Sequence, residues 1–368
     1  MLLTVLGFVV GFALSFRCAT AYERYSEGRK YWAQLTLTSR NLARLIWINV
    51  LERPDTEALE ATEDSPAVPA THNYKKDLLA KISAINLINA FAVALKHRLR
   101  FEPAVNYPDL LNLVSHMPTM ASGADQSKLR HQKPSAMHAL GEHLGVTFAQ
   151  SNPRKLIKRS RENLGNLPNE ILNYLSAYLD QVINEDKTVP IICTQNLLYS
   201  DVRVLADVLT GTERVLNTPL PLAYSISIAQ ITWAYIMVLP FQLFSKLDWI
   251  TIPATLVAAY IILGLAIIGR EIENPFGNDV NDLPLEAYCN EIAADLDVLT
   301  SIPREQYKTF IDQTENRPLF PLSYTTITDW ENESVEDIRN ALKAKATTSS
   351  KSVQLQRVRT ELADIQVV

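Results

Sequence analysis

Two long uncharged segments dominate the hydrophobic pattern of the chain. The segments 222–244 and 249–270 contain no charged residue apart from Arg270 at the end of the second. Each reaches the roughly 20 residues that a membrane-spanning helix needs. Only Ser245–Asp248 separate them, which predicts an antiparallel helical hairpin. A buried hairpin of a soluble protein is the alternative, and the length of the two adjacent uncharged segments disfavours it.

The N-terminus is a third uncharged segment. No charged residue occurs before Arg17, and the apolar pattern predicts a span over about 1–22. A secretory signal peptide cleaved near Ala19–Ala21 is the alternative. That interpretation is disfavoured because a signal peptide carries its basic residues before the apolar segment, whereas Arg17 follows it.

Basic residues at the ends of the predicted spans indicate an orientation. Arg17 follows the uncharged segment of the first span, Arg214 precedes the second span and Arg270 follows the apolar part of the third. Because Lys and Arg are enriched on the cytosolic side of a membrane, all three ends are predicted to face the cytosol. The chain is therefore expected to be a multi-pass integral protein of the plasma membrane or an organelle membrane. Most of it is expected in cytosolic helices, over about 23–218 and 271–310.

The predicted cytosolic region has helical periodicity. Between Lys75 and Arg100, apolar residues recur at the spacing of one helix face. The uncharged part of this segment, 82–95, is too short to cross a bilayer and predicts a packing helix. Strand patterns are nearly absent, so the fold class is predicted to be all-α. Further helices are expected over about 29–51, 137–150, 168–186 and 191–216. Polar inserts at 54–71 and 116–134 interrupt a main unit over 1–310, and a tail follows over 311–368.

Composition and motifs argue against several functions. The formal net charge of −5 disfavours nucleic-acid binding, which favours a basic face. Three scattered cysteines do not form a disulfide framework or a zinc site. The six histidines are predicted to be solvated surface residues; His138 and His143 are spaced five apart, unlike the zinc motif H-E-x-x-H. No nucleotide-binding loop or activated nucleophile occurs, so we predict neither an enzyme, nor catalytic residues, nor a cofactor.

Three phenylalanines share one face of the first predicted span. Phe8, Phe12 and Phe16 occur at i, i+4 and i+8, so their rings line up along the helix. On spacing alone, an ordinary packing face is the alternative to a functional stripe.

Four parts of the chain, in order, resemble the bestrophin family of anion channels. They are Ser15–Leu35 (SFRCATAYERYSEGRKYWAQL), Phe91–Arg100 (FAVALKHRLR), Asn217–Ser225 (NTPLPLAYS) and Gly269–Leu285, with the motif Asn274, Pro275, Phe276 and Gly277. The likeness is strongest to the prokaryotic and fungal branch and covers roughly residues 1–310. The family unit has four transmembrane helices, and this chain opens inside the second, so its first helix is expected to be missing.

The resemblance implies a bestrophin-like helical membrane protein that assembles as a homopentamer in the lipid bilayer. Its axial pore would conduct chloride and other monovalent anions. By the same resemblance, Phe8, Phe12 and Phe16 form a hydrophobic neck and Leu220 forms a second constriction at the cytosolic exit. A plain hinge is the alternative for Leu220, between Pro219 and Pro221. A non-conducting membrane scaffold or regulatory subunit is the alternative for the whole protein.

The segment after the third span has two interpretations. In animal bestrophins an acidic run at this position binds calcium. Here Asp279 and Asp282 match acidic positions, whereas Asn278, Val280 and Asn281 do not. Calcium prefers several oxygen ligands, commonly including multiple carboxylates. Two carboxylates with backbone carbonyls would bind calcium only weakly, so the calcium site is the less favoured interpretation. The favoured interpretation is a capping turn.

In that turn, Pro275 and Gly277 are expected to end one helix and Asp282 is expected to cap the next.

Overall fold

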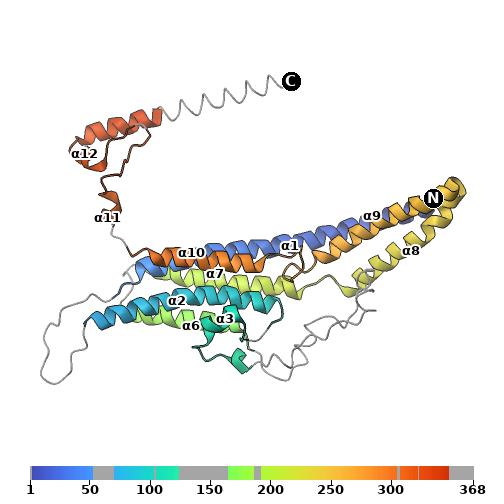
Figure 1. The fold of residues 1–368 in the computed structure, drawn as a ribbon, viewed down its shortest axis with the longest axis horizontal. Coiled ribbons are helices and arrows are strands. Elements are labelled where there is room, and N and C mark those ends of the chain that lie inside the picture. Colours follow the sequence, from blue (N-terminus) through green and yellow to red (C-terminus); the bar gives the residue numbers. More distant parts are fainter. Residues whose placement is uncertain are drawn as a thin grey trace. The chain divides into compact units, whose positions relative to one another are not determined.

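A computed structural model describes residues 2–52, 70–102, 105–123, 165–185, 192–304, 307–321 and 323–347. Helices joined by turns form this part of the chain, as the all-α prediction requires (Figure 1). The chain divides into two units, Met1–Ser301 and Ile302–Val368. The helix predicted over 137–150 and most of the inserts 54–71 and 116–134 lie outside the described residues.

A single helix, α1, covers Leu2–Asn49. The sequence pattern suggested a span over 1–22 and a separate helix over 29–51, but the structure joins the two. No proline occurs before Pro54, so nothing in this stretch removes a backbone hydrogen bond from the helix. At 1.5 Å per residue, α1 is about 70 Å long, which is more than twice the thickness of a bilayer core.

The predicted hairpin is present as α8 (Leu222–Leu247), the short 3₁₀ helix η3 (Asp248–Ile250) and α9 (Thr251–Glu271). Both long helices pack against α1 and against each other (Figure 1). The N-terminal part of α1 contributes Val10 and Leu14 to a small core with Ile228 of α8. This core is separate from the main one, so the hairpin and the start of α1 form their own helical layer.

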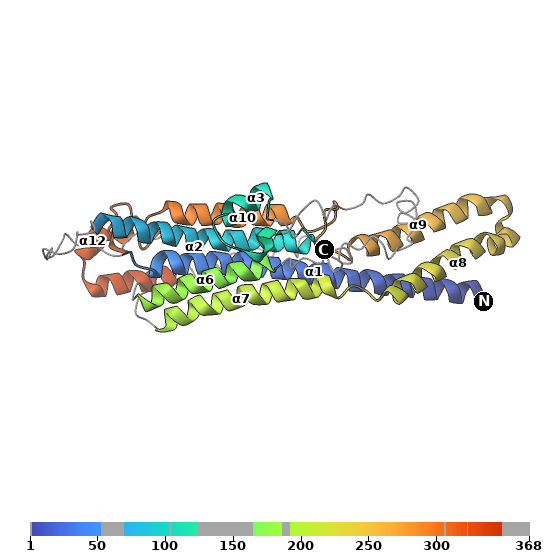
Figure 2. The ribbon, with the colours of Figure 1, turned by 90° about the horizontal axis from the view of Figure 1, so that it is seen from below.

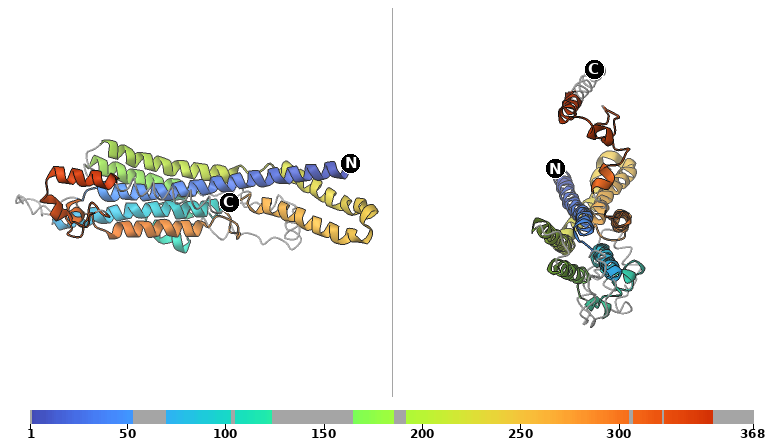
Figure 3. Two further views of the ribbon diagram at one scale, coloured as in Figure 1. Left: turned by 90° about the horizontal axis from the view of Figure 1, so that it is seen from above. Right: turned by 90° about the vertical axis from the view of Figure 1, so that its left-hand side faces the viewer.

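Three further helices pack against the C-terminal half of α1: α2 (Ala70–Leu99), α7 (Ile192–Asn217) and α10 (Leu285–Ser301). A fourth, α6 (Leu167–Asn184), packs against α2 and α7. In Figures 2 and 3 they run side by side with α1, away from the hairpin. Trp32, Leu42 and Phe91 are fully buried in their shared core. The shorter α3 (Pro108–Val114) and η1 (Met120–Gly123) follow α2. This bundle is the helical region expected outside the membrane.

Three described stretches are long and apolar enough to cross a bilayer: Thr4–Asn49, Tyr74–Leu99 and Ala223–Glu271. They differ in how much of their apolar surface the protein itself covers. In α2, 61% of the most apolar window is buried inside the protein, against 6% for the hairpin. The apolar residues of α2 therefore serve the bundle core, in agreement with a packing helix, whereas those of the hairpin remain available to lipid.

The second unit contains α11 (Tyr307–Ile311), α12 (Ile327–Glu331) and a further helix over 335–347. At the start of α12 the Asp329 carboxylate accepts hydrogen bonds from the backbone N–H and the hydroxyl of Thr326. These contacts satisfy polar groups at a helix start, as capping boxes do.

Candidate functional site

The three phenylalanines of α1 lie on its exposed face. Phe8, Phe12 and Phe16 keep 74%, 67% and 52% of their surface exposed. Val10 and Leu14, on the opposite side of the helix, are buried against the hairpin. The main packing face of α1 within one chain is therefore not the phenylalanine stripe, although Phe16 at its end also reaches α8. In a helix apolar enough to cross a bilayer, such an exposed row contacts either lipid or another chain.

Each ring of the phenylalanine stripe contacts another aromatic ring. Phe8 and Phe12 stack with centroids 6.4 Å apart and planes 16° from parallel. Phe16 meets Tyr224 of α8 edge to face, with centroids 6.4 Å apart and planes at 78°. Aromatic pairs prefer these offset and edge arrangements, which limit the freedom of each ring.

Leu220 lies in the link between α7 and α8 and is half-buried. Pro221 ends this link, and its carbonyl accepts hydrogen bonds from the backbone N–H groups of Tyr224 and Ser225, at 3.0 and 3.2 Å. Thr218, at the start of the link, contacts α1 through Arg24. Phe16 and Arg24 are separated by about 12 Å of helix at 1.5 Å per residue. The link that contains Leu220 therefore contacts α1 at Arg24, beyond the last residue of the predicted neck, Phe16.

The motif residues Asn274–Gly277 attach the end of α9 to α1. The Phe276 side chain is fully buried in the main core. A methyl group at Gly28 of α1 would lie 3.0 Å from two ring carbons of Phe276 and 3.3 Å from Pro275 Cγ. Gly28 therefore provides the space that Phe276 fills. Asn274 and Gly277 form the adjoining turn, where a methyl group at Gly277 would collide with the Asp282 carboxylate.

The predicted helix caps in this segment were wrong. α9 ends at Glu271, before Pro275 and Gly277, and α10 begins only at Leu285. The Asp282 carboxylate instead accepts the backbone N–H of Asp279, at 2.7 Å. The Asp282 N–H donates to the Asp279 carbonyl at 3.1 Å, so the two residues close a turn on each other.

Burial raises the pKa of Asp282, although the hydrogen bond from the Asp279 amide opposes that shift. A raised pKa makes the Asp282 carboxylate less favourable to ionise, which is the opposite of what a calcium ligand needs. Among the described residues, no three His, Cys, Asp or Glu side chains gather in a group that could hold a metal ion. Asp279 and Asp282 remain a prediction as a weak calcium site.

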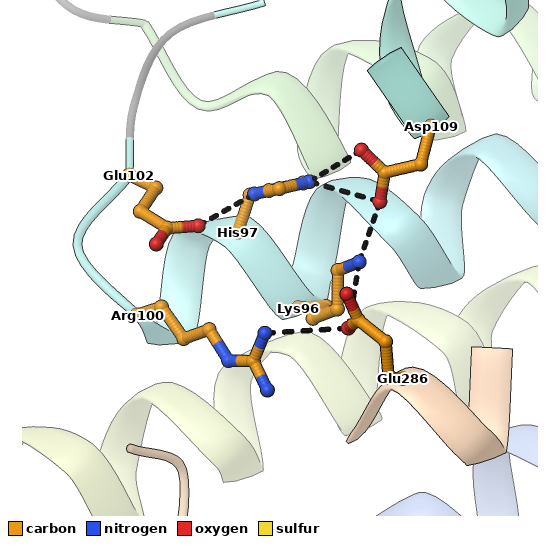
Figure 4. A network of polar contacts seen from close by, with 6 residues as sticks. All are labelled: Lys96, His97, Arg100, Glu102, Asp109 and Glu286. Carbon is orange, nitrogen blue, oxygen red and sulfur yellow. Dashed lines mark hydrogen bonds and ion pairs between the residues drawn. The ribbon is translucent and has the colours of Figure 1, made fainter. Parts of the chain in front are cut away.

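A polar network built on two buried cations of α2 joins α2, α3 and α10 (Figure 4). His97 was predicted to be solvated, and this was wrong: the side chain is buried and stacks on Tyr107, with ring centroids 4.1 Å apart. Its Nδ1 lies 2.7 Å from Glu102 and its Nε2 3.1 Å from Asp109. One signal in the sequence could have indicated this: α2 ends on basic residues, and the acidic residues Glu102 and Asp109 follow shortly after.

Lys96 completes this network. Its Nζ is paired with Asp109 at 2.5 Å and with Glu286, at the start of α10, at 2.9 Å. Arg100 also reaches Glu286, at 3.3 Å. A buried ammonium is tolerated because two carboxylates compensate its lost hydration. The network thus ties α10, which follows the turn at Asp282, to the end of α2.

Three further residues were not identified as a site from the sequence. Arg17 of α1 indicated only the membrane orientation, whereas Arg24 and Glu273 lay within segments that resemble the family. In the structure Arg17 Nη2 lies 3.5 Å from Glu273 Oε2, and Arg24 Nε donates to the Glu273 carbonyl at 2.9 Å. No local pattern reveals these contacts, because about 250 residues of chain separate the partners.

The fold and the uncovered hairpin define a helical membrane protein. Comparison with known proteins adds the family: residues 1–298 match the family of bacterial and fungal bestrophin proteins. The chain therefore belongs to the bestrophin family.

Curated relatives agree with this assignment. A voltage-dependent anion channel-forming protein of Synechocystis is 34% identical over 295 residues, which cover 80% of this chain and 76% of that protein. A protein of the same description from Nostoc is 33% identical over 313 residues, covering 84% and 80% of the two chains. A crystal structure of a bacterial bestrophin homolog from Klebsiella pneumoniae has the same fold, with a TM-score of 0.54, 24% identity and coverage of 81% and 86%.

Proposed function

We propose that the protein is a channel that passively conducts chloride and other monovalent anions. In this proposal five copies surround one axial pore, and Phe8, Phe12 and Phe16 of each copy form its hydrophobic neck. The observation that carries the proposal is the exposed phenylalanine stripe opposite the packed face of α1. Two relatives described as voltage-dependent anion channel-forming proteins support the anion as the conducted species.

The chemistry of the stripe suits such a neck. A narrow ring of apolar side chains resists wetting, so ions cross it only when it widens. Aromatic rings carry partial positive charge at their edges, and rings turned edge-on to the axis favour an anion over a cation. Leu220 forms the second constriction in this proposal. The start of α1 and the hairpin lie in the bilayer, and the helical bundle lies in the cytosol.

Chloride flux into liposomes that contain the purified protein tests the neck. Replacing Phe12→Ala removes apolar bulk from the proposed neck, and we expect the flux to rise on the order of tenfold, equivalent to a barrier about 1.4 kcal/mol lower. Phe241→Ala is the matched control, because Phe241 of α8 is also an exposed apolar ring but lies outside the stripe. We expect the control to conduct like the parent protein.

Two other outcomes would count against the proposal. Equal effects of Phe12→Ala and Phe241→Ala would show that the stripe faces lipid. No flux from a protein that native mass spectrometry shows to be a pentamer of 41.3-kDa chains would favour the non-conducting scaffold.

In the same assay we expect a calcium chelator to leave the flux unchanged. A calcium response that Asp282→Asn abolishes would instead establish the calcium site.

A further inference from the structure

Arg24 of α1 joins three segments that are far apart in the sequence. Its Nε donates to the backbone carbonyl of Glu273, and its Nη1 donates to the backbone carbonyl of Thr218. Glu273 follows the end of α9, whereas Thr218 begins the link that contains Leu220. A guanidinium suits this task because its planar fork directs several N–H donors at once. We call Arg24 with these two carbonyls the Arg24 bridge.

Each acceptor of the Arg24 bridge is itself fixed. The Thr218 N–H and hydroxyl both donate to the Arg214 carbonyl at the end of α7, at 3.0 and 2.7 Å. Glu273 is held a second time, because its carboxylate pairs with the buried Arg17. Arg17 and Arg24 are seven residues apart and so lie on nearly the same face of α1. The bridge therefore connects well-anchored backbone and not a mobile loop.

Next to the bridge, α9 packs closely on α1 at Gly269. A methyl group at Gly269 would lie 3.1 Å from Cys18 Sγ and 3.7 Å from the backbone nitrogen of Cys18. α1 is one unbroken helix from Phe8 to beyond Arg24, so the phenylalanine stripe and Arg24 are held on the same element. A shift of Thr218 against Arg24 is then also a shift of Leu220 against the phenylalanine stripe.

We propose that Arg24 is a positioning residue that sets the place of Leu220 relative to the neck helix, so that the two constrictions of the pore keep a fixed spacing. This inference rests on the proposed channel function. Arg24 acts through the backbone of Thr218 and not through contact with an anion. Glu273 and Arg17 strengthen the attachment of α9 to the same level of α1.

The readout is the permeability ratio of thiocyanate to chloride in planar bilayers, and Leu220→Ala shows how this ratio responds to a change at the proposed Leu220 constriction. We expect Leu220→Ala to change this ratio at least twofold. Arg24→Gln should change it in the same direction, and the double variant should show no further change. Arg24→Lys should show a partial effect, because one ammonium cannot reproduce the fork. Glu273→Ala should have less effect than Arg24→Gln, since the backbone carbonyl of residue 273 remains.

A second measurement does not depend on conduction. The protein for this measurement carries Cys193→Ser and Leu220→Cys, and a charged maleimide reports how accessible position 220 is. The signal of the Cys193→Ser protein without Leu220→Cys is subtracted. We expect Arg24→Gln to raise the modification rate severalfold. Arg40→Gln is the control, because Arg40 of the same helix makes only partly exposed ion pairs with Glu291 and Asp295.

The outcomes separate the two proposals. Absence of anion flux from the parent protein would refute the channel function, and the labelling rate would still test the Arg24 bridge. An Arg24→Gln variant that assembles as the parent does, with a parent-like labelling rate, would overturn the bridge. If that variant does not assemble, Arg24→Lys decides in the same way: an unchanged labelling rate and permeability ratio would overturn the inference.

Discussion

Single residues in this protein matter mainly for the space they fill or leave. Phe276 was recognisable as part of a family motif, but its role as a buried anchor against Gly28 depends on the contact between α1 and the end of α9. The exposed Phe12 has the opposite character, since its side chain is available for a function outside its own chain.

Gly28→Ala tests the anchor at the residue scale. The added methyl group would press on the Phe276 ring at 3.0 Å, so we expect the free energy of unfolding to fall by about 1–3 kcal/mol. Thermal unfolding in detergent measures the change. Gly264→Ala of α9 is the control, because a methyl group there meets no atom within 4 Å. A melting temperature for Gly28→Ala equal to that of the control would refute the anchor.

Among the helices, polar contacts determine how α2, α3 and α10 join. Burial opposes ionisation of Asp109, but hydrogen bonds from Lys96 and His97 outweigh it and hold the pKa of Asp109 below its ordinary 3.8. For Lys96, burial alone would lower the pKa, and the bonds to Asp109 and Glu286 raise it instead. The ionised network is therefore the form that stabilises the packing of these three helices.

Asp109→Asn tests this network. A carboxyl with a lowered pKa contributes stability above its ordinary pKa, and that contribution is lost as the pH falls through the lowered value. We expect the variant to lose about 1 kcal/mol at pH 7, a small value because Asp109 is partly exposed. The difference from the parent protein should disappear once the pH has fallen below the lowered pKa of Asp109. Asp297→Asn, an exposed change on α10, is the control for unfolding measured across this pH range.

A loss of stability at pH 7 that persists unchanged at low pH would contradict the electrostatic origin. It would indicate that the amide introduced by Asp109→Asn disturbs packing instead.

At the scale of the whole molecule, the division between hairpin and bundle predicts a membrane topology. In a Cys193→Ser background, a membrane-impermeant maleimide should label Leu79→Cys of α2 from the cytosolic side only. It should label Ser245→Cys, at the turn of the hairpin, from the other side only. Both positions are exposed in the structure, so labelling depends on access from each compartment. Labelling of both from the same side would refute the predicted orientation.

Much of the fold could be predicted because membrane helices follow from local sequence. Charge-free length located the hairpin to within a few residues, since a bilayer excludes charge wherever the residue lies in the chain. The start of α10 and the position of Asp282 were mispredicted because a proline or glycine marks a helix end only approximately. The candidate neck followed from helical spacing together with the family resemblance.

The sequence by itself determined the helical class, the uncharged spans, the common face of Phe8, Phe12 and Phe16, and the family. Only the tertiary structure decided which face of α1 packs against the hairpin. It also decided that His97 is buried and that Arg24 connects Thr218 to Glu273. The physical reason is the sequence distance over which each property is determined. Periodicity and charge-free length depend on residues that are neighbours in the sequence, whereas burial and hydrogen bonding depend on segments that meet only when the chain has folded.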